Sequence, residues 1–259
     1  MLEKSYRAAK EQDLDIVVFG CDFYDTERQS YRPCTYSINK ALLPDKPVFT
    51  AQDVQQDVFR LFIGWSWDKL FRREFVEKHG LQFQVQRTTN DLLFVFSAIL
   101  YAERIAVMDD VFAHYRSSAE SLSVTREKSW TCFYNALMAL RDELHKMGSY
   151  ERFEQDFKNY CVNFTLWNLR TLKEPTHTLL YNKLREEWFE EMDLLKHPKE
   201  YFYHEHEYVC FRKIYENPVP EKGYDEMPTG LAARVIRCYH DHGLLYTAKY
   251  IVKKILGRT

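Results

Sequence analysis

The stretch covering residues 65–116 most narrows the fold that this chain can adopt. Apolar runs and polar breaks alternate along it, which is the pattern of an α/β unit. Asp91 stands at the predicted start of an apolar helix over residues 92–102. A strand-like segment follows and ends in His114-Tyr115-Arg116. The stretch therefore predicts an α/β layer with polar side chains at the ends of its elements.

The segments before this stretch predict a helix followed by a buried strand. Residues 1–12 have helical spacing, and residues 16–20 form a continuous apolar run typical of a central strand. Further along, we predict short strands at 35–38 and 81–85 and helices at 50–62 and 66–79. Residues 105–115 predict the strands that close the layer.

The spacing of apolar residues changes near Ser121. From there they recur every three or four positions, and the pattern predicts two long amphipathic helices within residues 126–172. Another helix is predicted over 181–195, and residues 197–230 indicate a loop-rich segment. We therefore expect an α/β domain over residues 1–120 and a helical extension over residues 121–259.

Composition narrows the functional class and the compartment. The chain has 259 residues and a net charge of −2, which gives nucleic-acid binding no support. Its six cysteines are scattered without a CxxC pair, which disfavours a zinc ribbon and suits a reducing cytosol. No stretch approaches the roughly 18 apolar residues of a membrane span, and no signal peptide is visible. We expect a cytoplasmic protein.

The C-terminal residues 246–258 leave two interpretations open. They form a short amphipathic pattern in which apolar positions alternate with lysines and one arginine. Such a helix would suit a peripheral contact with the inner face of the cell membrane, where lipid-linked acceptors reside. A terminal helix docked on the protein, with its lysines in water, explains the pattern slightly better.

Three groups of residues, taken in their order and spacing, carry a resemblance to a known family. The chain resembles the acceptor-side half of a family 2 glycosyltransferase with the GT-A fold, the family that builds bacterial capsular and other surface polysaccharides. The resemblance covers roughly residues 1–130. The matching residues are the block of Trp67, Lys69, Leu70 and Phe71, then Asn90-Asp91 with Phe94, and His114-Tyr115-Arg116.

This resemblance implies a reaction and a cofactor. A sugar would pass, with inversion, from a nucleotide-sugar donor to a hydroxyl of a glycan or lipid-linked acceptor. The cofactor would be Mg²⁺ or Mn²⁺. Its main ligands, like the nucleotide-binding turn, would lie upstream of Met1, so we expect an incomplete GT-A-like layer that is inactive alone.

Three explanations of that missing half stay open. Another chain supplies it, it has been lost by truncation, or the fold has been remodelled and no longer uses a donor site. A non-catalytic binding or assembly module derived from a glycosyltransferase is the alternative function.

The resemblance assigns roles to three polar residues. Asp91 would be the catalytic base that takes the proton of the acceptor hydroxyl. The alternative for Asp91 is an ordinary helix cap, since Asp is favoured at that position. Arg116 would bind the donor diphosphate, whose oxygens suit the guanidinium fork. His114 would help to bind a divalent metal on that diphosphate, although a strand end that simply meets solvent explains it better.

Four neighbouring residues, Trp65, Trp67, Asp68 and Lys69, could line an acceptor groove, because sugars stack on aromatic faces and carboxylates bind hydroxyls. The alternative is that one tryptophan is core, which is the preferred interpretation of Trp67, and that the lysine is a solvated stem. Asp22 and Asp25, just past the central strand, could face the same cleft or serve a turn. The segment 204–207, His-Glu-His-Glu, is interpreted as surface rather than as a metal site.

Overall fold

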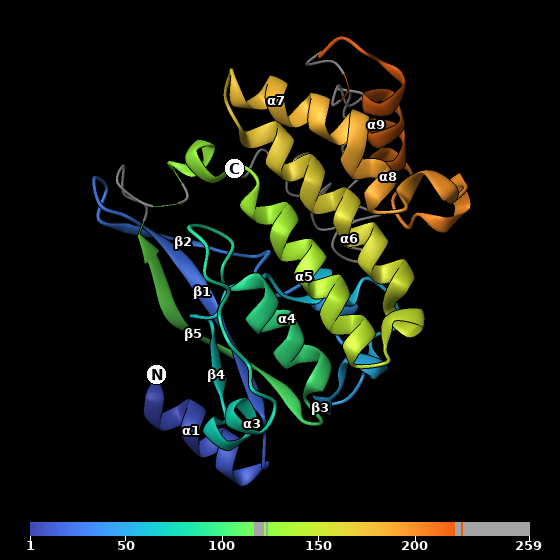
Figure 1. Ribbon diagram of the computed structural model, residues 1–259. Helices are drawn as coiled ribbons and strands as arrows, with labels where there is room; N and C mark the ends of the chain where they lie inside the picture. The colour runs from blue at the N-terminus through green and yellow to red at the C-terminus, as the bar shows by residue number, and fades with distance from the viewer. Residues whose placement is uncertain (117–121, 123, 221–223, 225–259) are drawn as a thin grey trace, which may run out of the picture.

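The computed structural model describes residues 1–116, 122, 124–220 and 224. Within that part of the chain, five strands form one mixed sheet in the order β2-β1-β5-β3, and β4 also pairs with β1 (Figure 1). The mixed α/β class that the sequence predicts is therefore confirmed. The strands are β1 (Ile16–Asp25), β2 (Ser30–Pro33), β3 (Val48–Phe49), β4 (Lys69–Phe71) and β5 (Ile105–Arg116).

Strand β1 is the central strand of this sheet. It runs parallel to β5 along one edge, and along its other edge it pairs antiparallel first with β4 and then with β2. The side chains of Ile16, Val17 and Val18 are at most 1% exposed, so the predicted buried strand at 16–20 is confirmed. Both edges of β1 have neighbours in the structure, whereas the sequence led us to expect missing ones.

The register of β1 against β5 shifts at Gly20, where β5 bulges toward it. A Cβ atom at Gly20 would lie 3.2 Å from Cγ2 of Val111 and 3.3 Å from the backbone oxygen of Asp110. Both distances are tighter than most Cβ contacts, so any residue other than glycine at position 20 would require the bulge to shift. Beyond the bulge, Asp22, Phe23 and Tyr24 of β1 pair in order with the last three residues of β5.

Helices cover both faces of the sheet. The helix α1 packs on a small cluster around Leu14, Val17 and Ala106, while α4 and α5 belong to the large core cluster on the opposite face. The helices are α1 (Leu2–Glu11), α2 (Val58–Leu61), α3 (Arg73–Lys78), α4 (Leu92–Tyr101), α5 (Cys132–Lys146), α6 (Tyr150–Thr171), α7 (Thr176–Lys183), α8 (Phe189–Glu191) and α9 (Glu205–Glu216), with a π-helical turn at Leu184–Trp188 and 3₁₀ turns at Lys40–Leu42, Ala51–Asp53, Arg126–Ser129, Leu194–Lys196 and Lys199–Tyr201.

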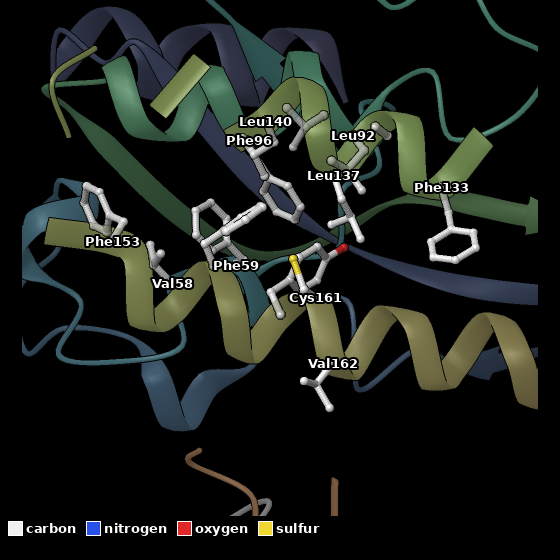
Figure 2. Packing of buried hydrophobic residues seen from close by; sticks show 14 of the residues in the cluster. Val58, Phe59, Leu92, Phe96, Phe133, Leu137, Leu140, Phe153, Cys161 and Val162 are labelled. Carbon is white, nitrogen blue, oxygen red and sulfur yellow. The ribbon is translucent and has the colours of Figure 1, made fainter. Parts of the chain in front are cut away.

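One hydrophobic core joins the sheet to the helices that follow residue 120. Figure 2 shows the ring of Phe96 of α4 directed toward α6, on the side where Phe59 of α2 and Cys161 of α6 lie. The rings of Phe59 and Phe96 meet edge to face at 5.3 Å. The core continues across residue 120, and the division into two domains at that position stays a prediction.

The long helices and the long strands agree with the sequence. The apolar helix is α4, the strand before His114 is β5, and the two amphipathic helices are α5 and α6. In these segments the apolar spacing is regular and the packed face is wide, so the local pattern and the tertiary contacts favour the same structure.

Several short elements differ from the sequence-based prediction. The predicted helix at 66–79 contains strand β4 followed by the short helix α3, because β4 pairs with the centre of the sheet. The predicted helix at 50–62 is interrupted at Asp57, whose φ of 58° is left-handed, and only α2 follows. Residues 35–38 form a turn with one bridge at Ile38, residues 81–85 are irregular, and the predicted loop after residue 197 contains α9.

Candidate functional site

Three aromatic rings from distant parts of the chain stack together beside the sheet. Trp65 and Trp67 lie between α2 and β4, with ring centroids 4.6 Å apart and planes 21° apart. The ring of Tyr115, on β5, stacks at 6.2 Å from Trp65 and 5.8 Å from Trp67. All three are partly buried, so each keeps some surface open to solvent. We call Trp65, Trp67 and Tyr115 the aromatic platform. Such flat apolar faces with polar edges suit a sugar ring.

Asp68 and Lys69, which follow the platform tryptophans, form a buried ion pair. Lys69 Nζ lies 2.6 Å from Asp68 Oδ1, and neither side chain has any exposed surface. Burial lowers the pKa of Lys69 and raises the pKa of Asp68, while the opposite charge of the partner works against both shifts. The prediction that these two residues line an acceptor groove needs correction, because neither side chain reaches solvent. The interpretation of Lys69 as a solvated stem is wrong for the same reason.

Asp91 occupies the position before the first residue of α4. Its side chain is partly buried, and it makes no capping hydrogen bond within the described part of the chain. The backbone N–H groups of Asp91 and Leu92 nevertheless lower the pKa of its carboxyl, so the interpretations of Asp91 as base and as cap both stay open. Burial raises the pKa of its carboxyl, these backbone N–H groups and the charge of Lys69 oppose that rise, and the charge of Asp68 adds to it. A carboxylate with a raised pKa is a stronger base than an exposed one.

The segment that carries the tryptophans lies against the start of α4. A Cβ atom at Gly64 would sit 3.6 Å from the Cα of Leu92, in ordinary van der Waals contact. Trp65 follows Gly64 directly in the chain, and Asp91 directly precedes Leu92. The structure therefore brings the aromatic platform and the predicted base to the same end of α4.

The polar residues at the ends of β1 and β5 form a second group. His114 Nδ1 lies 2.6 Å from Asp22 Oδ1, and the His114 ring lies 4.8 Å from the ring of Tyr31. The His114 side chain is 51% exposed, and Arg116 is exposed at the end of β5. Alternation along a strand sends His114 and Arg116 to one face and Tyr115 to the other. The structure brings Asp22 and His114 together and separates them from the platform.

Sequence reasoning missed two features of this region. Tyr115 belonged to the quoted motif without a role, yet it completes the platform. The alternation of side chains along β5 could have revealed it, since Tyr115 must face away from its two neighbours. Asp22 was left between a cleft and a turn, and its partner His114 lies 92 positions away. Asp25 serves the turn, because its Oδ1 accepts hydrogen bonds from the backbone of Glu27 and Arg28.

Neither a cluster of metal-binding side chains nor a membrane-spanning helix is found in the part of the chain that the structure describes. Among residues 1–116, 124–220 and the two isolated ones, no three His, Cys, Asp or Glu side chains come together as a metal site would require. In the segment 204–207, His204 Nε2 lies 2.8 Å from Asp57 Oδ2, and Glu207 pairs with Arg60. In the same part of the chain, the helices are too short or too polar to cross a bilayer. The amphipathic segment 246–258 lies outside the described residues.

Comparison with known proteins identifies the chain as similar to glycosyltransferases, although no family model matches it. It is 34% identical over 126 residues to EpsJ of Bacillus subtilis (strain 168), a protein named as a glycosyltransferase; the match covers 48% of this chain and 35% of EpsJ. It is 26% identical over 129 residues to EpsH of the same organism, also named as a glycosyltransferase, covering 47% of this chain and 37% of EpsH. The chain thus matches a minor part of each relative.

Among solved structures, the chain aligns with S. aureus TarS, residues 1–349. The alignment with the UDP complex has 16% identity and a TM-score of 0.35, covering 83% of this chain and 61% of that chain. With the UDP-GlcNAc complex the identity is 14% and the TM-score 0.40, covering 83% and 62%. TM-scores this low establish no shared fold, so the functional argument rests on the sequence relatives and on the site.

Proposed function

We propose that the chain is the acceptor-side part of a family 2-like glycosyltransferase with a GT-A fold. It would transfer a sugar from a nucleotide-sugar donor to a hydroxyl of a glycan or lipid-linked acceptor in bacterial surface polysaccharide synthesis. The observation that carries this proposal is the partly buried Asp91, uncapped among the described residues, at the end of α4 where the tryptophan segment packs. The similarity to EpsJ and EpsH supports the transferase class.

The proposed chemistry uses Asp91 as a general base. An acceptor sugar stacks on the aromatic platform with its hydroxyl directed to the carboxylate. As the hydroxyl oxygen attacks the anomeric carbon of the donor, its proton passes to Asp91. The bond between the anomeric carbon and the diphosphate oxygen breaks, the nucleoside diphosphate leaves with the electron pair, and the configuration inverts.

The donor would contact the other group of residues, at the end of β5. Arg116 is exposed there, and its planar guanidinium suits two phosphate oxygens at once. The contact between Asp22 and His114 would hold the imidazole in one orientation beside the donor. These two roles come from the resemblance, since Arg116 and His114 lie on the face of β5 opposite to Tyr115 and the structure does not bring them to the Asp91 site.

The cofactor and the location are proposed on the resemblance alone. Mg²⁺ or Mn²⁺ would neutralise the leaving diphosphate when bound. The described residues do not fit as its ligand set, so no step above depends on the ion. Since the chain covers 35% of EpsJ, we propose that the donor-binding part lies outside the matched segment. A cytoplasmic location, with a peripheral membrane contact through residues 246–258, completes the proposal.

The proposal predicts transfer by a completed enzyme, which we define as this chain fused to the part of EpsJ that it does not match. We expect release of a nucleoside diphosphate from one member of a panel of UDP-, GDP- and dTDP-sugars when a bacterial envelope lipid and glycan extract is added. Trp67→Ala should raise the acceptor KM roughly tenfold, because a stacking face is lost. Phosphate-coupled detection of the released nucleoside diphosphate measures both the transfer by the completed enzyme and the acceptor KM of Trp67→Ala.

The control is Trp167→Ala, which removes a 48% exposed tryptophan on α6. It should leave the acceptor KM unchanged. If the completed enzyme released no diphosphate from any donor while the chain still bound the extract, the non-catalytic binding module would replace this proposal.

A further inference from the structure

Lys69 makes contacts that the proposed function does not use. Its Nζ is 2.6 Å from Asp68 Oδ1, 2.7 Å from the carbonyl oxygen of Trp65 and 3.0 Å from that of Ile63. An ammonium group has three hydrogens to donate, so these three acceptors satisfy it completely. Burying this charged side chain costs desolvation free energy, so a specific role for Lys69 would explain why the cost is borne.

We propose that Lys69 is a positioning residue for the Asp91 site: it fixes the backbone that carries the tryptophans, and it holds a positive charge at the end of α4 that Asp91 precedes. The catalytic consequence rests on the proposed function, whereas the contacts and the test below do not require transfer.

The first role follows from where the two carbonyl groups lie. Ile63 and Trp65 flank Gly64, whose backbone packs against Leu92 at the start of α4. Lys69 itself belongs to β4 and pairs with Val18 of the central strand. The ammonium therefore ties the tryptophan segment to the sheet at the point where that segment meets α4.

The second role follows from the charged groups that face Asp91. The carbonyl groups that accept hydrogen bonds from Lys69 flank Gly64, which packs against Leu92, the residue after Asp91. The groups whose charges act on Asp91 or respond to it include Lys69 and Asp68 of the β4 segment and Tyr160 of α6. Burial raises the pKa of Tyr160, so it stays neutral while Asp91 titrates. The side-chain charges that act on Asp91 are then those of Lys69, which favours the anion, and of Asp68, which opposes it, while the backbone N–H groups of Asp91 and Leu92 also favour the anion. Both act through a protein interior that screens them weakly.

The test is the titration of Asp91, followed by NMR of the chain with aspartate labelled by ¹³C at Cγ. Asp68→Asn keeps the size and removes the negative charge that opposes ionisation of Asp91. The pKa of Asp91 should therefore fall wherever ¹⁵Nζ NMR shows that Lys69, which loses the charge that holds its own pKa up, is still protonated. The double variant D68N/K69M removes both charges, so the pKa of Asp91 should rise. We expect the two variants to differ by about one pH unit or more. The indole N–H signals of Trp65 and Trp67 should move or broaden in the double variant alone.

The matched control is K40M/D109N, which removes a surface ion pair whose side chains are 71% and 90% exposed. It should leave the pKa of Asp91 unchanged. Equal Asp91 pKa values in the parental chain and in both folded variants would overturn the proposal. If the double variant failed to fold, D68N alone would decide, since an unchanged or raised Asp91 pKa with Lys69 protonated contradicts the proposed charge balance. Turnover plays no part in this readout, so failure of the transfer assay is a separate result.

Discussion

Replacing Lys69 by methionine is expected to lower the free energy of unfolding by about 3–5 kcal/mol, the range typical of breaking a buried ion pair from one side. The Asp68 carboxylate would remain inside the protein without its cation. Its Oδ2 already has no hydrogen-bond partner among the described residues, so nothing nearby replaces the lost ammonium. Two backbone carbonyls, of Ile63 and Trp65, would also lose their donor.

Urea unfolding followed by circular dichroism measures this effect, and its pH dependence has a defined sign. Without Lys69 the folded-state pKa of Asp68 should lie further above its unfolded value. The loss of stability is then largest near neutral pH and shrinks as the pH falls toward the unfolded value of about 4. Lys40→Met, at the exposed pair with Asp109, should leave the midpoint nearly unchanged. A parental midpoint in Lys69→Met would show that the pair is not buried as described.

Asp91→Asn is expected to reduce kcat of the completed enzyme by about 10²–10⁴-fold, the usual contribution of a general base. Asparagine keeps the size of the side chain but cannot accept the proton. Folding should not suffer, because Asp91 makes no capping hydrogen bond with the described residues. Burial raises the pKa of this carboxyl, which means that the charged form is disfavoured in the folded state. The neutral amide should therefore be tolerated or slightly stabilising near neutral pH.

Steady-state kinetics together with thermal unfolding separates these effects. Asp109→Asn, which changes an exposed aspartate on β5, is the matched control and should keep the parental kcat. Near-parental turnover by Asp91→Asn, with unchanged thermal stability, would remove Asp91 from the mechanism.

Elements with a long regular spacing or an unbroken apolar run were predictable from the sequence. The apolar run that forms β1 and the spacing that forms α5 and α6 each admit one buried arrangement. The strand β4 was not predictable, because three residues carry little periodicity and their pairing with β1 comes from residues about fifty positions away. The local pattern there favours a helix, but pairing with β1 makes the segment a strand.

In the candidate site, too, features with a local sequence signal were predictable and features set by long-range contacts were not. Asp91 was predictable because its place before an apolar helix is a local signal. The burial of Asp68 and Lys69 was not predictable, since nothing in the local sequence distinguishes a buried, ion-paired lysine from a solvated one. The stacking of Tyr115 on Trp65 depends on the register between β1 and β5 and on the path of the loop before β4. Both features are set by long-range contacts.

The pH dependence of kcat/KM in the completed enzyme tests the central claim, that Asp91 is the base of a glycosyl transfer, most directly. A base works when deprotonated, so the rate should fall as the pH falls through the pKa of Asp91. Burial raises that pKa, so the acid limb should lie above the ordinary range of an aspartate. We expect the parental enzyme to show this limb and Asp91→Asn to show a residual rate without it. An Asp91→Asn profile that kept the same acid limb would contradict the assignment.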